Sequence, residues 1–381
     1  MAKPKPQYYL DTRILSIFFL VAMPFVAFGA YVVLGLANSS MRQEVGESLE
    51  QRATESRFRV ERYVGDQVVE LRLMTRWPEL AQALGKAPAL KPEEAERLAR
   101  LWGEADTEFL QSITGTPLSA RLRDVIAVRP GIKVLQVADA RGVLVASSGR
   151  SGRLRNHDAP WFTGTTQEPV VERPWVSDVF KPAGSSQPML EVAWPVLNAE
   201  GVLQGAIRML IDAQDLYGVL APVRIGRTGH AELVRAKDGI VLASDQAPRV
   251  LEARMPGFDM LEAAMASRRG HWTVPERRRK ASQQAAALDE PARIVAVSRV
   301  EQVPGVEWLV VVEQDLDEAL ATLDRVRKYL WIHFAGAFGT VILLGLYYSF
   351  KLEQPELESE VGIVEELEHP TPAAPEGEKS A

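Results

Sequence analysis

The sequence contains no cysteine, which removes several structural and chemical options. Disulfide bonds, thiolate metal sites and cysteine nucleophiles are excluded for this chain. The hydrolase motif Gly-x-Ser-x-Gly and the phosphate-loop motif Gly-x-x-x-x-Gly-Lys are also missing. The lack of cysteine does not identify a compartment, because many exported proteins also lack disulfides.

Histidine is scarce as well, with five residues among 381. None of them has the HExxH spacing of a metal site or a comparable paired spacing; they are His157, His230, His271, His333 and His369. We therefore predict no enzyme activity, no catalytic or metal-binding residues and no cofactor.

An excess of positive charge is also lacking. The net charge is -6, which gives no basis for predicting a nucleic-acid partner. With 381 residues, 46% of them hydrophobic and 25% charged, the chain can bury one large core or two medium ones.

A repeated segment organises the middle of the chain. VLQVADARGVLVASS at 134–148 recurs in altered form as AELVRAKDGIVLASD at 231–245, with Gly142 aligned on Gly239. In each copy two β-rich runs flank a short turn, where a glycine supplies the positive φ of a tight hairpin. Such hairpins can resemble one another by chance, but the similar strand positions favour two tandem copies of one α/β module.

Two long apolar runs predict transmembrane helices. The first, residues 14–36, follows the basic segment 1–13 and covers roughly 34 Å, enough for a hydrocarbon core of about 30 Å. A cleavable signal peptide is the alternative, but its apolar region is typically only about 7–15 residues long, which favours an uncleaved anchor. The second run is residues 330–350, with aromatic residues near both ends.

The charges around the first run predict the orientation of the chain. Basic residues ahead of it place 1–13 in the cytoplasm, and a second span returns 351–381 to the cytoplasm. The segment 37–329 then lies in the periplasm or outside the cell. Basic residues at 325–328 disagree with this orientation, but a large translocated domain is little governed by local charge. The tail has nine glutamates, two lysines and four prolines and is predicted to be disordered.

A long amphipathic helix is predicted at 41–77. Its apolar stripe recurs at steps of four and seven and comprises Val45, Leu49, Ala53, Val60, Val64, Val68 and Leu71. Because this stripe exceeds what one neighbouring module obviously covers, we predict a homodimer along the helix. Residues 81–90 are expected to form a loop, followed by a second helix from Lys91 to about Gln111.

Two strand-rich modules are predicted next, a first module at about 131–216 and a second module at about 225–315. After its hairpin the first contains the segment NHDAPWF and a strand pair split by a turn at 198–201. The second contains a helix near 260–267 and strands near 271–274, 293–299 and 307–313. A helix starting after Asp315 is expected to continue into the second apolar run.

The order of these segments resembles the double Cache family of bacterial extracytoplasmic sensors over roughly 41–325. The matching stretches are ARGVLVASS, DAPWF, EVAWPVLNAEGVLQGAI and the closing VPGVEWLVVVEQDLDEAL. The resemblance implies an α+β fold with two tandem PAS-like modules on a long N-terminal helix, flanked here by two transmembrane helices. It also implies that the first module is distal to the membrane and binds a small ligand, while the second is proximal.

Family members that bind amino acids hold the ligand's charged groups with a set of residues that is mostly missing here. Ala159 stands at the arginine position and Phe180 at the tyrosine position. Pro182 and Leu210 stand at the two aspartate positions, with Asp212 two residues beyond the second. We therefore do not expect a free α-amino acid as the ligand.

If a ligand pocket remains in the first module, we expect an aromatic wall with a few polar groups, as small-molecule pockets generally have. The expected wall is Trp161, Trp175, Phe180 and Trp194, and the expected polar groups are Asp158, Arg173, Asp178 and Arg208. Instead of contacting a ligand, each tryptophan could belong to the hydrophobic core, and each charged residue could lie on a solvent-exposed face.

The sequence thus predicts a membrane-anchored extracytoplasmic sensor that binds a small ligand in the first module. The 31 residues after the second run are too few to fold as a signalling domain, so the signal would pass to a separate cytoplasmic or membrane protein. The alternative is a scaffold or assembly protein that uses the same fold to bind other proteins. The absence of the residues that hold an amino-acid ligand, and of a signalling output domain, favours this alternative.

Overall fold

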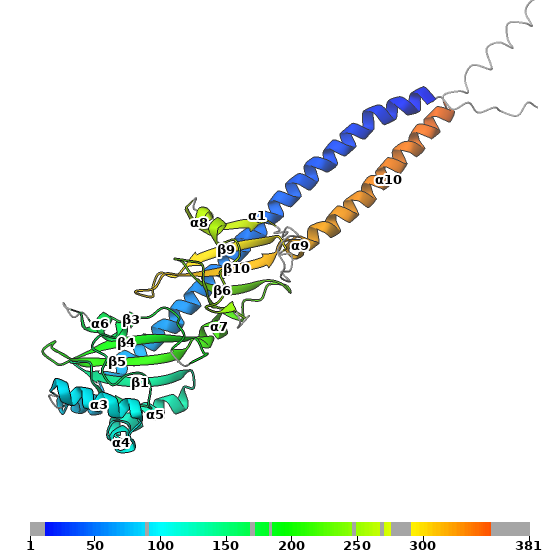
Figure 1. Ribbon diagram of the computed structural model, residues 1–381. Helices are drawn as coiled ribbons and strands as arrows, with labels where there is room; N and C mark the ends of the chain where they lie inside the picture. Colours follow the sequence, from blue (N-terminus) through cyan, green and yellow to red (C-terminus); the bar gives the residue numbers. More distant parts are fainter. Residues whose placement is uncertain are drawn as a thin grey trace, which may run out of the picture. The chain divides into compact units, whose positions relative to one another are not determined.

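Two five-stranded antiparallel sheets with the same strand order form the framework of the chain (Figure 1). In this computed structural model the orders are β2-β1-β5-β4-β3 and β7-β6-β10-β9-β8. The structure describes residues 12–87, 91–167, 172–182, 185–245, 249–266, 270–275 and 291–351. Each sheet begins with one copy of the repeated hairpin, so the predicted α+β fold with two tandem modules is confirmed.

The first module follows the long helix α1 (Thr12–Met74). Its elements are α2 (Pro78–Gly85), α3 (Pro92–Glu104), α4 (Thr107–Thr114), α5 (Pro117–Val128), β1 (Ile132–Asp139), β2 (Leu144–Ser147), α6 (Pro160–Thr166), β3 (Trp175–Val176), β4 (Met189–Leu197) and β5 (Leu203–Asp212). Helix α7 (Gln214–Leu220) leads to the second module. This contains β6 (His230–Arg235), β7 (Val241–Ala243), α8 (Phe258–Ala266), β8 (His271–Val274), β9 (Arg293–Arg299) and β10 (Trp308–Asp315), followed by α9 (Leu316–Ala319) and α10 (Ala321–Lys351).

The two hairpins turn by the same means. Gly142 and Gly239 have φ angles of +80° and +75°, in the left-handed region that favours glycine. An aspartate stabilises each turn, because the carboxylates of Asp139 and Asp238 accept hydrogen bonds from backbone N–H groups within the turn. The shared chemistry explains why this segment shows the repeat so clearly.

Helix α6 packs on one face of the first sheet, and helix α8 packs on one face of the second sheet. We call these the α6 face and the α8 face. On the α6 face of the first sheet, the core includes Trp102, Ile113, Leu144, Trp161, Phe162, Ala193 and Ala206. The opposite face meets α1, where the guanidinium of Arg72 lies 5.6 Å from the ring of Trp194. On the α8 face of the second sheet, the core includes Val234, Phe258, Leu261, Val295, Leu309 and Val311.

Most of the predicted amphipathic stripe of α1 is buried within the chain, and only Val45 and Val68 are partly exposed. Leu49, Ala53, Val60, Val64 and Leu71 are each at most 1% exposed. Helix α1 passes along both sheets (Figure 1). The chain's own modules therefore cover most of the stripe from which the homodimer was predicted, and the homodimer itself stays a prediction.

The helices between α1 and β1 differ from the prediction. Residues 81–90 were expected to form a loop, but Pro78 begins α2, a position where proline is favoured because its missing N–H has no helical partner. The single helix expected up to Gln111 is two helices. Ala105 ends α3 with a φ of 61°, and the carboxylate of Asp106 caps α4 by accepting from the N–H of Phe109 at 2.8 Å.

The helix expected to continue without a break after Asp315 is interrupted. Helix α9 ends at Ala319, Leu320 is a turn residue, and α10 begins at Ala321. The short helix is held to the second module by Glu318, whose carboxylate accepts from the backbone N–H groups of Arg227 and Thr228 at 2.7 and 2.8 Å.

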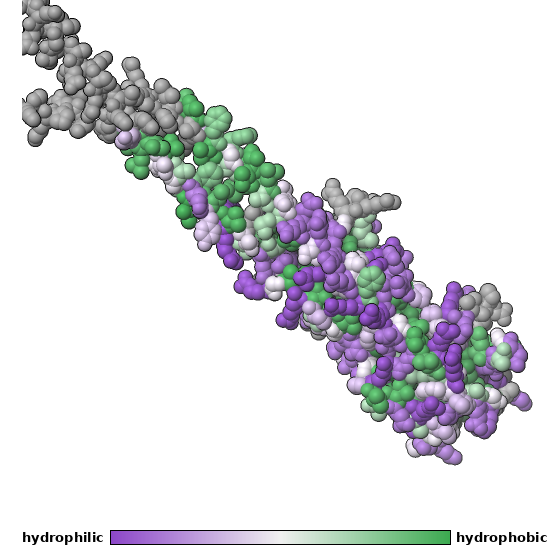
Figure 2. All heavy atoms as spheres, turned by 180° about the vertical axis from the view of Figure 1, so that it is seen from behind, coloured by the Kyte–Doolittle hydropathy of each residue, from purple (hydrophilic) through white to green (hydrophobic). Residues whose placement is uncertain are grey.

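The chain divides into two compact units. Gln43–Ala319 forms one unit, and the described residues up to Arg42 and from Leu320 onward form the other. By length and composition, α1 over Pro24–Met74 can cross a membrane, and it is the one such helix found in the part of the chain that the structure describes. Large hydrophobic side chains are exposed on its first half and on α10, where Figure 2 shows a mainly hydrophobic surface. The predicted tails 1–13 and 351–381 lie almost entirely outside the described residues.

Gly205→Ala should destabilise the first module. A Cβ at Gly205 on β5 would lie 2.1 Å from the carbonyl oxygen of Ala138 on β1, so the paired backbones would have to move apart. We expect chemical denaturation to show a loss of about 1–3 kcal/mol in the free energy of unfolding. Gly103→Ala in α3, where a Cβ meets nothing within 4 Å, is the control and should gain about 0.5–1 kcal/mol. Equal effects of the two substitutions would contradict this account.

Candidate functional site

A buried ion pair lies at the centre of the α6 face of the first sheet. Arg208 on β5 is 7% exposed, and its guanidinium donates to the carboxylate of Glu191 on β4 at 2.6 Å. It also donates to the side-chain oxygen of Gln136 on β1 at 2.8 Å. The same guanidinium lies 5.1 Å from the ring of Trp161 in α6. Three strands and one helix therefore converge on one charged side chain.

Burial changes the protonation of both members of this pair. It raises the pKa of Glu191, opposed by the attraction of Arg208. It lowers the pKa of Arg208, again opposed by the partner. The two groups stabilise each other's charged forms, so neither charge presents itself unpaired to a ligand.

Only three of the eight predicted ligand contacts meet at this place. Trp161 and Arg208 are in contact, and Trp175 packs against the same core cluster. Trp194 is buried on the opposite face, because it follows Ala193 on β4 and neighbouring strand residues point to opposite faces. Phe180 pairs with Met189 beside the end of β4.

The remaining three predicted contacts are charged residues with other positions. Asp158 forms an exposed pair with Arg153 at 3.1 Å, and that hydrogen bond lowers the pKa of Asp158. Arg173 is exposed. Asp178 joins the two modules, since its carboxylate accepts from the indole N–H of Trp308 on β10 at 2.9 Å.

The sequence analysis missed Glu191 and Gln136. Both are polar residues within apolar strands, MLEVAWPVL and IKVLQVAD. In a strand buried on both faces, such a residue must point into the interior and find a partner there. Reading Glu191, Gln136 and Arg208 together as three such exceptions would have predicted the cluster.

A cavity borders the core cluster of the first module. It has a volume of about 440 Å³ and lies between α2, α4, α5 and β2. Its apolar lining includes Leu98, Phe109, Ile113, Leu144 and Leu154, which also belong to the cluster around Trp161 or pack against it. Glu79, Lys86 and Asp139 contribute polar groups. None of the eight predicted residues lines it.

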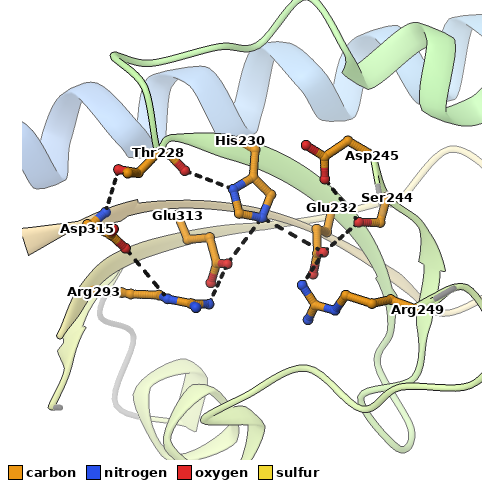
Figure 3. Close-up of polar contacts among 9 residues, drawn as sticks. All are labelled: Thr228, His230, Glu232, Ser244, Asp245, Arg249, Arg293, Glu313 and Asp315. Carbon is orange, nitrogen blue, oxygen red and sulfur yellow. Dashed lines mark hydrogen bonds and ion pairs between the residues drawn. The ribbon is translucent and has the colours of Figure 1, made fainter. Parts of the chain in front are cut away.

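The second module holds a larger charged network on its α8 face (Figure 3). Glu232 on β6 and Glu313 on β10 are 1% and 3% exposed. His230 lies between them, with its Nε2 3.2 Å from the carboxylate of Glu313 and 3.8 Å from that of Glu232. Arg249 pairs with Glu232 at 2.9 Å and Arg293 with Glu313 at 2.8 Å. The cations and carboxylates alternate, so each of the two carboxylates lies between two cations.

The network fixes the protonation state of its histidine. Contact with the carboxylate of Glu313 is the main cause that raises the pKa of His230 to about 9, against the opposing effect of burial. Burial raises the pKa of Glu232, whereas His230 and Arg293 lower that of Glu313. His230 is therefore a cation at neutral pH.

The two clusters occupy equivalent places in the two modules. The N–H of Gly142 donates to the carbonyl of Asp139, the last residue of β1, and that of Gly239 donates to Arg235, the last residue of β6. The second turn is thus one residue longer. Counting back from the strand ends places Gln136 and Glu232 at equivalent positions.

Sequence reasoning missed this second cluster as well. It dismissed His230 because no metal spacing was present, although His230 and Glu232 share one face of a strand. The signal available was again charge within an apolar strand, as with Glu313 in WLVVVEQD. Within the residues that the structure describes, no group of three or more histidine, aspartate or glutamate side chains is arranged to hold a metal ion.

The chain thus combines a long helix with two sheets of identical strand order, each of which carries a charged cluster. The chain belongs to the Cache domain family: the dCache_1 model, described as a Cache domain, matches residues 37–323. The resemblance noted from the sequence is therefore confirmed, and with it a class of ligand-binding sensor domains. A search of curated proteins gives no match.

Solved structures of chemoreceptor ligand-binding domains are similar to this chain in fold. The domain of Pseudomonas aeruginosa PctC, solved with GABA, is 17% identical, with 71% of this chain and 100% of that chain covered and a TM-score of 0.44. The domain of Pseudomonas fluorescens CtaA, solved with L-serine, is 15% identical, with 72% and 99% covered and a TM-score of 0.45. The domain of Campylobacter jejuni Tlp3, solved with 4-methylisoleucine, is 12% identical, with 74% and 94% covered and a TM-score of 0.49.

Glu191→Ala should destabilise the first module, because it leaves the guanidinium of Arg208 buried without a carboxylate. We expect a loss of about 3–5 kcal/mol in the free energy of unfolding, measured by chemical denaturation. Replacing both residues by methionine removes both charges and should restore most of that loss. A double variant as unstable as the single one would contradict a charge-based explanation.

The stability contributed by His230 should depend on pH. Its pKa is raised from 6.5 to about 9 in the folded chain, so the contribution is complete below pH 6.5 and is lost as the pH rises through 9. We expect the difference in unfolding free energy between the natural chain and His230→Gln to shrink over this range. The exposed His157→Gln serves as the control. A difference that stays constant with pH would count against a charged His230.

Proposed function

We propose that the chain is a membrane-anchored extracytoplasmic sensor that binds a small ligand in its first module and signals to a separate partner protein. Membership of the Cache family supports the sensor role. The apolar, exposed first half of α1 supports the anchor. The observation that carries the ligand-binding part is the cavity of about 440 Å³ in the first module.

The size and lining of this cavity favour a small, mainly apolar ligand. Small-molecule pockets typically have volumes of about 300–1,000 Å³. Two of the polar groups at its edge are already engaged: Glu79 pairs with Arg121, and the carboxylate of Asp139 holds the hairpin turn. Lys86 is left to interact with a polar group of the ligand.

The predicted residues Trp161 and Arg208 remain part of this proposal. The indole N–H of Trp161 is buried and has no hydrogen-bond acceptor among the described residues. A buried donor without an acceptor costs about 1–3 kcal/mol, so an acceptor group on a ligand that reached it would be favourable. The cavity borders the cluster that contains this side chain.

The proposed topology follows the sequence. Residues 14–36 within α1 would form the first span and 330–350 within α10 the second, with 37–329 outside the cytoplasmic membrane and both termini inside. A homodimer would use a different face of α1 from the buried stripe. Phe58, Val69 and Leu73 are about half exposed and lie on one side of the helix, which suits contact with a second copy.

One observation favours the alternative of a protein-binding scaffold. In the centre of the first module, the charges that could meet a ligand are those of Arg208 and Glu191, which already pair with each other. Because these two interior charges already neutralise each other, a charged ligand is not required as their partner. Ligand binding in the cavity separates the two functions.

A bulky substitution in the cavity should abolish ligand binding without unfolding the chain. Ala83 on α2 lines the cavity, and Ala83→Leu would fill part of it. We expect a thermal-shift screen of the compact unit 43–319 against amino acids, organic acids, amines and purines to find a stabilising compound. At 100 times its dissociation constant it should stabilise the fold by about 2.7 kcal/mol.

The matched control is Ala81→Leu, on the exposed side of the same helix. The stabilisation should disappear in Ala83→Leu and persist in Ala81→Leu. A well-folded natural unit that gives no hit, or a hit unaffected by Ala83→Leu, would favour the scaffold or a different site.

A further inference from the structure

A second, larger cavity lies between the two modules, within the compact unit 43–319. Its volume is about 840 Å³. The first module contributes the segment before β4 and the start of α7, the second module contributes β7 and Val250, and α1 contributes Tyr63. Pro188, Val219, Leu242 and Ala243 give it apolar walls. This volume suits a small molecule that would touch both modules at once.

One wall of this cavity carries a carboxylate that pairs with no cation among the described residues. Asp215 on α7 is hydrogen-bonded to the hydroxyl of Tyr63 at 3.3 Å, and it forms no ion pair with any residue that the structure describes. Burial and the charge of Asp215 raise the pKa of Tyr63, so the phenol stays a donor and orients the carboxylate. Nearby cations are already paired, Arg129 with Glu70 and Lys133 with Asp212.

A second carboxylate, that of Asp245, also lines this cavity. Asp245 follows β7, and its described contact is the hydroxyl of Ser244 at 3.4 Å. Lys181 is the lysine that lines the cavity, and it is engaged by Glu252 at 2.7 Å. The basic residues Arg224 and Arg227 line a neighbouring cavity of about 450 Å³ that meets this one at Asp245 and Tyr217. The larger cavity is therefore the acidic one of the two.

We propose that the cavity between the modules is a second ligand site, specific for a small organic amine. Asp215 and Asp245 would hold the ammonium group or groups, since charge-assisted hydrogen bonds to a carboxylate are the strongest available there. The apolar walls would contact the hydrocarbon part. The site is independent of the cavity in the first module and shares no lining residue with it.

The charged network of the second module connects this site to the end of β10. The hydroxyl of Ser244, which lines the cavity, donates to the carboxylate of Glu232 at 2.7 Å. From Glu232 the contacts continue through His230 and Glu313 to Arg293, which lies 3.8 Å from Asp315 (Figure 3).

Asp315 is the last residue before α9, so the network reaches the start of the exit helix. Its backbone N–H donates to the hydroxyl of Thr228 at 3.2 Å, and Thr228 in turn holds Glu318 of α9. An amine bound at Ser244 and Asp245 would therefore bias the arrangement of the residues that connect the module to α10.

Binding is tested by titration calorimetry on the full-length chain in detergent. The probes are cadaverine and phenethylamine, with pentanediol and phenethyl alcohol as neutral counterparts. At least one amine should bind and neither alcohol should. Asp215→Asn and Asp245→Asn should each weaken binding by about tenfold or more, as expected for loss of a charged hydrogen bond.

Two control variants make the result specific. Asp259→Asn removes an exposed carboxylate outside the cavity and should bind the amine as the natural chain does. Ala83→Leu, in the first module, should also leave amine binding unchanged, so this test succeeds or fails separately from the first-module site. The proposal is overturned if neither amine binds, if the alcohols bind equally, or if both cavity variants retain full affinity.

The connection to α9 is tested by hydrogen exchange of the backbone amides at 315–319. A bound amine should slow exchange there in the natural chain. In Glu232→Gln the amine should still bind but leave these amides unchanged, because the network is broken between the cavity and β10. Unchanged exchange in the natural chain with the amine bound would overturn the coupling.

Discussion

The structure depends on one constraint: a charge on the inner face of a sheet must be paired before a helix can cover that face. Removing an ion from water costs several kcal/mol unless a partner of opposite charge and further hydrogen bonds replace the lost solvation. In the first module Arg208 meets this condition with Glu191 and Gln136. In the second module a longer series of alternating charges, with His230 at its centre, meets it. Both sheets are therefore closed by internal pairing at equivalent places.

The different lengths of the two networks separate the roles of the modules. The pair in the first module joins three neighbouring strands and ends within the sheet. The network in the second module runs along β6 and β10 and ends at Asp315, where α9 begins. Close to Asp315, the loop at 226–228 holds the carboxylate of Glu318. Hydrogen bonds from this loop stabilise the charged form of Glu318 and lower its pKa to about 2. Helix α10 then starts after a single turn residue.

The sequence predicted the framework well because periodicity and turn chemistry are local. The repeated hairpins, the paired strands β4 and β5 and the stripe of α1 all follow from residue types that impose a backbone conformation or a buried face. The breaks at Ala105 and Leu320 were missed, since neither residue is a typical helix terminator. Most of the site was also missed. Trp194 and Asp178 were grouped with Trp161 as the aromatic and polar residues of one expected pocket, yet strand alternation and the contact with Trp308 direct them elsewhere.

The paired interior charges favour different ligands in the two sites proposed above. A charged ligand entering the α6 face would have to displace Glu191 or Arg208 from its partner, and breaking a buried pair costs several kcal/mol that the new contacts must first recover. An apolar ligand in the neighbouring cavity meets no such penalty, because it replaces little more than water against hydrophobic walls. In the site proposed between the modules the situation is reversed: among the described residues Asp215 pairs with no cation, so a positively charged ligand would gain a partner there without displacing one. Within each module the interior charges already have partners, so binding of a charged ligand there is unfavourable. In the site proposed between the modules, binding of a charged ligand is favourable.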